Sequence, residues 1–310
     1  MFDIFIFTFI SVILPIFIQI AIGFCAQKKF KFDLRTLSKT QMYIFIPVLV
    51  FYKIYHSDIG GDLVLKLIAA SLLILIAVLI IAFSVGRICR FKKNQLFAFV
   101  PTVIQYNSGN FCIPLLQLLY NSDPFVMSIQ AVMMTAQNIT QCTVGVFFSS
   151  CGKMPVKKAL LNMLKLPIIY ACLISAILKG FNIPVWQPIM STAQIMSGCL
   201  VPLALFTLGA QLAQIKINFS DWKIYVSNLL KLTISPLVAL AVVNILHITG
   251  QAAQAIIIIT SAPSAVNTLI IAMEYDNEVE FTSKTVFSST VLSAITVTIV
   301  ICLVQMYIPV

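Results

Sequence analysis

Two short polar stretches interrupt apolar segments of the chain, and each has a proline in it or shortly after it. The first runs from Asn107 to Asn110 ahead of Pro114, and the second runs from Pro263 to Asn267. Asparagine and serine side chains compete with a helix for backbone hydrogen bonds, and proline cannot donate to the carbonyl four residues earlier. Each stretch therefore predicts a helix that ends and then restarts.

The chemistry of such a break suits a carboxylate. A restarting helix presents unpaired N–H groups and the positive end of its dipole, and amide side chains add donors without a second permanent charge. Gly109 tolerates a left-handed turn, and we expect Pro114 and Pro263 to mark the two breaks. The alternative is a plain proline kink whose asparagines bond a neighbouring helix. The predicted substrate-binding residues are Asn107, Gly109, Asn110, Asn138, Pro263, Ser264 and Asn267.

The composition places these stretches in a membrane. Of 310 residues, 60% are apolar and 10% are charged, whereas a soluble domain is about a quarter charged. So few charges cannot cover a surface in water, which excludes a soluble enzyme. It also excludes a nucleic-acid partner, although the net charge is +10. We expect an all-α integral membrane protein in contact with lipid.

Cofactor and metal chemistry have little support in the sequence. The eight cysteines contain no C-x-x-C pair, and the two histidines lie at the ends of apolar segments. No phosphate-binding glycine loop is present. The acidic residues between 274 and 280 lack the paired arrangement of an intramembrane transferase. We predict no catalytic residue, no metal and no cofactor.

Ten apolar runs have about the length that a bilayer-spanning helix needs. The second and the sixth are the shortest. The runs cover residues 4–26, 40–55, 63–85, 96–120, 124–149, 166–181, 188–213, 224–247, 251–273 and 284–308.

Most basic residues fall in the loops after the odd-numbered runs. Because positive loops stay in the cytosol, both termini are predicted on the extracytoplasmic side of the plasma membrane. Prolines recur at a nearly constant separation: Pro15 and Pro47 in the first half correspond to Pro167 and Pro202 in the second. Two five-helix halves of opposite sense form an inverted repeat, which is typical of secondary transporters. The halves are residues 1–150 and 166–310, and a short basic cytosolic linker at 151–165 joins them.

The stretches at 107–116 and 263–276 resemble the fourth- and ninth-helix signatures of the auxin efflux carrier family. That family includes bacterial malonate and malate carriers and is related to the bile acid/sodium symporters. The resemblance implies that helices four and nine are broken and cross each other. It also implies a scaffold of helices one, two, six and seven that mediates a homodimer, and a moving transport domain of the other helices. Asn107 matches an asparagine that faces the substrate carboxylate, and Asn138 matches one beside the substrate. Cys142 replaces an aromatic hydroxyl of the plant carriers, which argues against an indole substrate.

The predicted function is secondary transport of a small organic carboxylate across a bacterial plasma membrane, by an elevator-like mechanism. A sodium-coupled organic-anion symporter and an anion channel remain alternatives. Because no acidic residue lies well inside a run, a carboxylate proton relay is not expected. We expect Lys231 to snorkel to the cytosolic surface. The alternative is a fixed charge that draws anions to the cavity. The identity of the substrate, the direction of transport and the coupling stay open.

Overall fold

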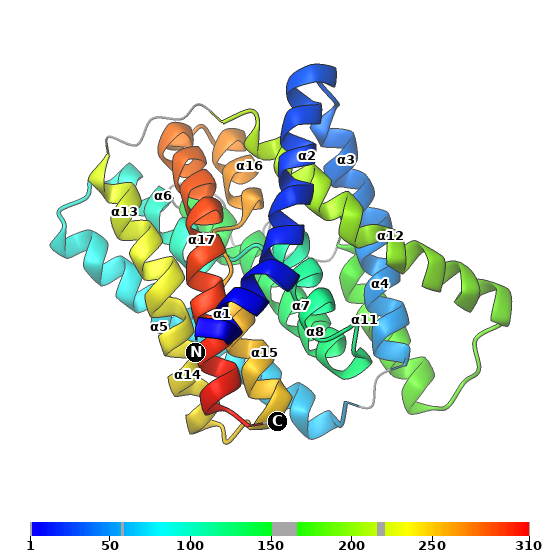
Figure 1. Ribbon diagram of the computed structural model, residues 1–310. Helices are drawn as coiled ribbons and strands as arrows, with labels where there is room; N and C mark the ends of the chain where they lie inside the picture. The colour runs from blue at the N-terminus through cyan, green and yellow to red at the C-terminus, as the bar shows by residue number, and fades with distance from the viewer. Residues whose placement is uncertain (1, 57–58, 151–165, 216–220, 310) are drawn as a thin grey trace.

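The computed structural model describes residues 2–56, 59–150, 166–215 and 221–309, and these residues form helices and connecting turns without a strand (Figure 1). The predicted linker at 151–165 lies outside the described residues. Within them, five helices are long and apolar enough to cross a membrane. They are Phe5–Phe30, Gly61–Ile88, Gln187–Leu212, Trp222–Ile245 and Val279–Tyr307.

Helices occupy each of the ten apolar runs, and five-residue π-helical turns lie inside several of them. The first half contains α1 (Phe2–Thr8), η1 (Phe9–Ile13), α2 (Leu14–Phe30), α3 (Leu34–Thr40), η2 (Gln41–Phe45), α4 (Ile46–Tyr55), α5 (Gly61–Ile88), α6 (Lys93–Ile104), η3 (Ser108–Cys112), α7 (Ile113–Leu119), α8 (Pro124–Thr140), η4 (Gln141–Gly145) and α9 (Val146–Ser149). The second half contains α11 (Pro167–Gly180), α12 (Gln187–Leu212), α13 (Trp222–Leu229), η5 (Leu230–Ile234), α14 (Ser235–Ile245), α15 (Gly250–Ser261), α16 (Val266–Glu274) and α17 (Val279–Tyr307).

The second run differs most from its predicted bounds. The sequence predicts a helix over 40–55, whereas the observed helix begins at Leu34. Asp33 caps this start, since its carboxylate accepts from the Arg35 N–H at 3.0 Å and from the Thr36 hydroxyl at 2.5 Å. These two bonds also hold the pKa of Asp33 below its usual value, and the Thr36 bond contributes more. The helix therefore gains its first turns from a cap in the polar loop.

Four π-helical turns directly precede a proline. η1, η2, η3 and η5 each end two residues before a proline. A proline lacks the N–H that would bond the carbonyl four residues earlier, and a π-turn lets the helix absorb this loss without stopping. Pro114 therefore bends its helix but does not end it. The four prolines are Pro15, Pro47, Pro114 and Pro236.

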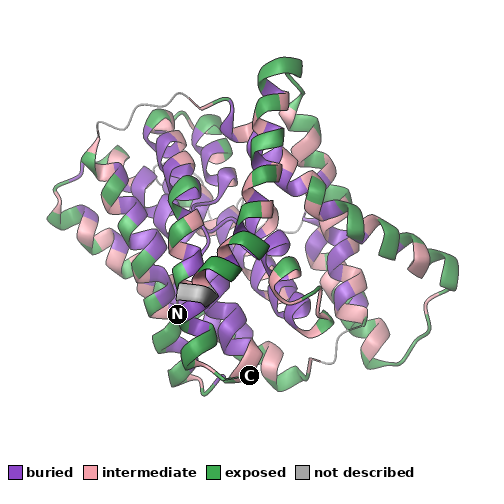
Figure 2. Cartoon of the chain, in the orientation of Figure 1, coloured by how far each residue is buried: buried purple, intermediate pink, exposed green. Residues whose placement is uncertain are grey.

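The helices pack in two groups. α2, α4, α11 and α12 contact one another, on the right of Figure 1. α5, α6, α8 and the helices from α13 to α17 contact one another on the other side. Buried residues gather where helices face each other, and the outward faces are largely exposed (Figure 2). Both chain ends lie in the lower half of Figure 1, away from the turn between α2 and α3 at the top.

Helices α2 and α12 approach each other at two glycines. A Cβ at Gly23 would overlap the Phe206 carbonyl, and a Cβ at Gly209 would overlap the Ile20 carbonyl. Each glycine thus faces the backbone of the opposite helix. Glycine at such a contact lets two membrane helices come close enough for extensive van der Waals packing.

This contact predicts a stability difference between two glycine substitutions on α12. Gly209→Ala inserts a methyl group into a space that the α2 backbone occupies, and overpacking of this kind costs about 1–3 kcal/mol. We expect the apparent melting temperature in detergent to fall by several degrees. Gly198→Ala is the matched control, because a Cβ there meets nothing within 4 Å. Equal melting temperatures for the two variants would contradict the close contact.

Candidate functional site

Two helices are interrupted at their middles. The first interruption separates Ile104, the end of α6, from Ser108, the start of η3. The second separates Ser261, the end of α15, from Val266, the start of α16. We refer to these non-helical segments, residues 105–107 and 262–265, as the two breaks.

The first break lies closer to the N-terminus than its sequence pattern suggests. Gly109 does not adopt the left-handed turn that a glycine tolerates, since it lies inside η3 and its φ is not positive. The reason is that Asn107 already starts the next helix: its side chain accepts a bond from the Asn110 N–H at 3.3 Å. Gln105 and Tyr106 therefore form the break, together with Asn107.

The two breaks bond directly to each other. The Asn107 N–H donates to the Pro263 carbonyl at 2.9 Å, and the Ala265 N–H donates to the Gln105 carbonyl at 3.2 Å. Tyr106 and Ser264 thus form an isolated antiparallel bridge. Backbone groups left free inside a membrane need such partners, because no water is available there. Each break supplies the hydrogen bonds that the other has lost.

Three predicted residues lie at this junction or behind it. The Pro263 carbonyl accepts the Asn107 bond, and the buried Ser264 hydroxyl donates to the Thr102 carbonyl at 2.6 Å. Pro114 is buried in the first turn of α7. None of the three lines the large cavity described next. The contacts observed for these three residues are with other parts of the protein. A role in substrate binding stays a prediction for Pro263 and Ser264.

A cavity of about 1400 Å³ borders both breaks. Residues from both helix groups line it, including Ser38 and Gln211 from α3 and α12. The structure brings five of the predicted binding residues to this cavity: Asn107, Gly109, Asn110, Asn138 and Asn267. The sequence pattern therefore located residues that border one cavity.

Polar side chains connect across this cavity. The Asn110 amide donates to Gln211 at 3.5 Å, and Gln211 donates to the Ser38 hydroxyl at 3.0 Å. The Asn267 amide donates to the Gln141 oxygen at 3.4 Å. The first chain of bonds joins a helix that restarts at a break to the group formed by α2, α4, α11 and α12. Gln211 thus connects that group of helices to the site through hydrogen bonds.

Two amide nitrogens at this cavity have no partner. Asn107 and Gln141 are each 6% exposed, and the Nδ2 of the first and the Nε2 of the second are buried without an acceptor. Among the described cavity-lining residues, these are the unpartnered buried side-chain nitrogen and oxygen atoms. Both are hydrogen-bond donors. An unpaired buried donor is costly, so the site favours a ligand that brings acceptors.

The helix ends add to this preference for acceptors. The starts of η3 and α16 both reach the cavity wall, through Asn107 to Asn110 and through Ala265 to Asn267. A helix start carries partial positive charge. Two helix starts therefore border the cavity that Asn107 and Gln141 also line.

The glutamines around the breaks are absent from the predicted site. Gln137 donates to the Gln105 side chain, and Gln130 donates to the Ser108 carbonyl at 2.6 Å. The Nε2 of Gln105 is a further buried donor without a partner. The sequence did contain a signal for these glutamines, since uncharged amides deep inside apolar helices need hydrogen-bond partners within the membrane. The sequence alone does not say which distant elements supply them.

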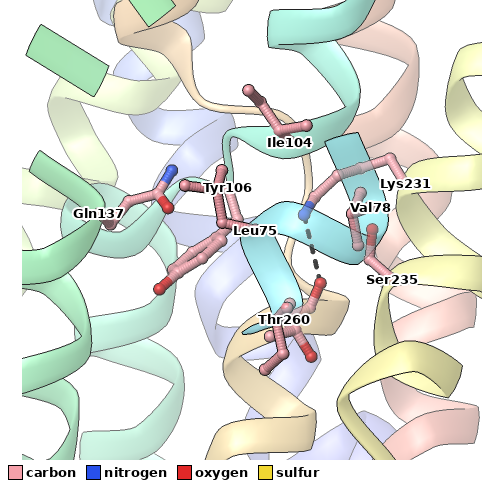
Figure 3. A pocket seen from close by; sticks show the side chains of 9 residues that line it. Leu75, Val78, Ile104, Tyr106, Gln137, Lys231, Ser235 and Thr260 are labelled. Carbon is pink, nitrogen blue, oxygen red and sulfur yellow. Dashed lines mark hydrogen bonds between the residues drawn. The ribbon is translucent and has the colours of Figure 1, made fainter. Parts of the chain in front are cut away.

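Lys231 does not snorkel to the surface. Its side chain is 1% exposed, and its Nζ donates to the Thr260 carbonyl at 3.3 Å, at the end of α15 (Figure 3). It also lies 5.2 Å from the centroid of the Tyr106 ring. The expectation of snorkelling is wrong because a carbonyl and an aromatic face near the breaks receive the ammonium instead.

Comparison with known proteins places the chain among transporters. It matches the family described as membrane transport protein over residues 8–156 and 152–301. An uncharacterised transporter of Methanothermobacter thermautotrophicus is 25% identical, and the match covers 85% of this chain and 86% of that protein. An uncharacterised transporter of Methanocaldococcus jannaschii is 22% identical, with 85% and 87% covered. These matches agree with the signatures around the two breaks, and the chain belongs to the auxin efflux carrier family of membrane transport proteins.

Proposed function

We propose that this protein is a secondary transporter for a small organic carboxylate, and that the substrate carboxylate binds where the two breaks meet. The observation that carries this proposal is the pair of buried, unpartnered donors, Asn107 Nδ2 and Gln141 Nε2, on two residues that line the cavity. A carboxylate offers about four acceptor positions and a negative charge. It therefore satisfies both donors and suits the two helix starts beside them.

Neutral amides suit a carrier better than a fixed arginine would. A permanent ion pair inside the membrane would hold the substrate strongly and leave an unpaired charge after release. Amide donors bind a carboxylate through charge-assisted bonds of about 1.5–3 kcal/mol each. Asn107 and Asn267 come from different helices, so both breaks contribute to one site. Asn138 closes its side in this proposal.

The proposed architecture has ten spans in two inverted five-helix halves, 1–150 and 166–310. The helical segments on all ten apolar runs support it, and so do the two matched stretches, which meet near the expected boundary. The group of α2, α4, α11 and α12 corresponds to the scaffold, together with α1 and α3, which lead into α2 and α4. The remaining helices correspond to the transport domain. In an elevator-like cycle, the transport domain moves past the scaffold and carries the two joined breaks with it. Gln211 would then lose its bond to Asn110 as the site moves.

The outer surface of the scaffold supports contact with lipid or with a second copy in a homodimer. Large apolar side chains on α11 and at the start of α12 point outward; they include Leu173, Ile177 and Ile189, which are 56%, 52% and 54% exposed. A membrane protein buries such surface against acyl chains or against another subunit.

Asn107→Ala tests the proposed site. We expect saturable counterflow of labelled malonate, malate or lactate into liposomes preloaded with the same unlabelled acid. The variant loses one charge-assisted bond, so its half-saturation concentration should rise by about ten- to a hundredfold. Asn244→Ala, an exposed asparagine on α14, is the matched control and should transport as the unmodified protein does.

Two results would contradict this proposal. One is an Asn107→Ala variant with unchanged affinity for the transported acid. The other is the absence of saturable counterflow with all three acids in the unmodified protein. Because counterflow requires a carrier that exposes its site alternately to the two sides, a channel would also fail this test.

The proposed orientation has its own test. Basic loops beside the cytosol place both termini outside. In a bacterial host, alkaline phosphatase fused after residue 310 should be active, and green fluorescent protein fused there should be dark. The same fusions after Lys92, in the basic loop before α6, should give the opposite pattern. A fluorescent fusion at the C-terminus would overturn the orientation.

A further inference from the structure

Lys231 stands out among the charged groups of the described residues. The three buried charged side chains are Lys53, Lys231 and Lys284, and none of the described acidic side chains is buried. Lys284 pairs with Glu280 at 2.6 Å, and Lys53 donates to the Ser122 carbonyl in the turn between α7 and α8. Lys231 alone of the three lies beside the breaks.

The ammonium of Lys231 has few partners for a buried charge. It has three N–H donors, and the one hydrogen bond observed goes to Thr260. The ring of Tyr106 provides a weaker contact. A buried charge with so little compensation is costly, so a nearby negative charge favours the ammonium strongly.

The groups that face this lysine supply no carboxylate. The Tyr106 hydroxyl donates to the Met133 carbonyl, and the Cys112 thiol donates to the Ile259 carbonyl. Helices α14 and α15 carry no charged residue, and on α17 Lys284 is paired with Glu280. On α6 and α13, the charged residues Lys93 and Lys223 lie in the first turns. On α5, Asp62 and Lys66 lie near the start of the helix and Arg87 lies in its last turn. No observed salt bridge among the described residues therefore balances a charge on Lys231.

Tyr106 connects the lysine to the substrate cavity. It lines the large cavity, and it also lines a small one of about 30 Å³ together with Lys231, Thr260 and Gln137 (Figure 3). The small cavity has space for about one water molecule. The lysine thus lies just behind the residue that forms the wall of the substrate site, with space for a water that can carry a proton.

The Lys231 ammonium lies where a transporter with broken helices would bind its coupling cation. In transporters with broken helices, the carbonyl ends of the half-helices hold the coupling Na⁺ or H⁺, and the opposite starts hold the anion. Here the Thr260 carbonyl at the end of α15 already receives the lysine. A cation that is part of the chain cannot be exchanged, but its charge can be gained and lost with a proton.

We propose that Lys231 is the proton-binding site that couples transport to the proton gradient, without sodium. The step is R–NH₂ + H₃O⁺ → R–NH₃⁺ + H₂O on one side of the membrane, and its reverse on the other. The bound carboxylate and the ammonium attract each other across Tyr106, so each strengthens the binding of the other. Proton and anion therefore move together. This inference rests on the proposed carboxylate transport.

The test compares two modes of transport of labelled malonate in the same liposomes. Counterflow at equal pH needs no net proton movement, whereas accumulation against a gradient needs a driving ion. With the membrane potential clamped by potassium and valinomycin, one proton per malonate gives up to about tenfold accumulation for one pH unit, acid outside. A sodium gradient at equal pH should give none.

Lys231→Met and Lys231→Arg separate the coupling from transport itself. The first has no titratable group and the second has a permanent charge, so both should lose pH-driven accumulation while keeping slower counterflow. Lys53→Met is the matched control, a buried lysine that also bonds a carbonyl, and it should keep both modes. A trapped pH dye should show malonate-dependent acidification of the lumen in the unmodified protein. The dye measurement uses only the unmodified protein, so it does not depend on whether a variant folds.

The outcomes distinguish the two proposals. Counterflow without pH-driven accumulation, accumulation driven by sodium, or an unchanged pH response in folded Lys231→Met would overturn the coupling and leave the carrier proposal intact. If the lumen is not acidified, the coupling is also overturned. Absence of counterflow with malonate, malate and lactate in the unmodified protein would overturn the carrier, and the coupling with it.

Discussion

The two backbone hydrogen bonds between the breaks are the constraint on which the rest of the structure depends. A helix interrupted inside a membrane leaves N–H and C=O groups that lipid cannot satisfy. Here the Asn107 N–H bonds Pro263, and the Ala265 N–H bonds Gln105. Neither interruption would be tolerable without the other. The surrounding helices must therefore hold two segments that lie far apart in the sequence at one point.

This junction separates donors from acceptors. The starts of the two restarting helices border the large cavity, and Asn107 and Gln141, whose buried amide nitrogens have no partner, are among the residues that line it. On the other side, the end of α15 presents the Thr260 carbonyl to Lys231, and Tyr106 lies between the two. The direction of the helix dipoles thus fixes where an anion and a cation would bind. The proposed substrate and the proposed proton occupy the two sides of one junction.

Much of this arrangement could be predicted from the sequence because it follows from local chemistry. Apolar runs predict helices, and asparagines in such runs mark the cavity wall. The exact break and its partners could not be predicted, for physical reasons. The helix continues through Pro114 by means of the π-helical turn η3. The interruption therefore lies nearer Gln105 than the sequence pattern predicts. The partners of Lys231 and Gln105 come from helices distant in sequence, so only the packed structure identifies them.

The central claim is that a carboxylate binds between the two breaks. Solid-state NMR distance measurement tests it directly, with ¹³C-carboxyl malonate bound to protein whose asparagine side chains carry ¹⁵N. The account predicts strong ¹³C–¹⁵N coupling at hydrogen-bond distance, about 3–4 Å. Each of Asn107→Ala and Asn267→Ala should weaken this coupling at saturating malonate, whereas Asn244→Ala should not. Bound malonate with no coupling to any asparagine, or with coupling that both variants leave unchanged, would contradict the account.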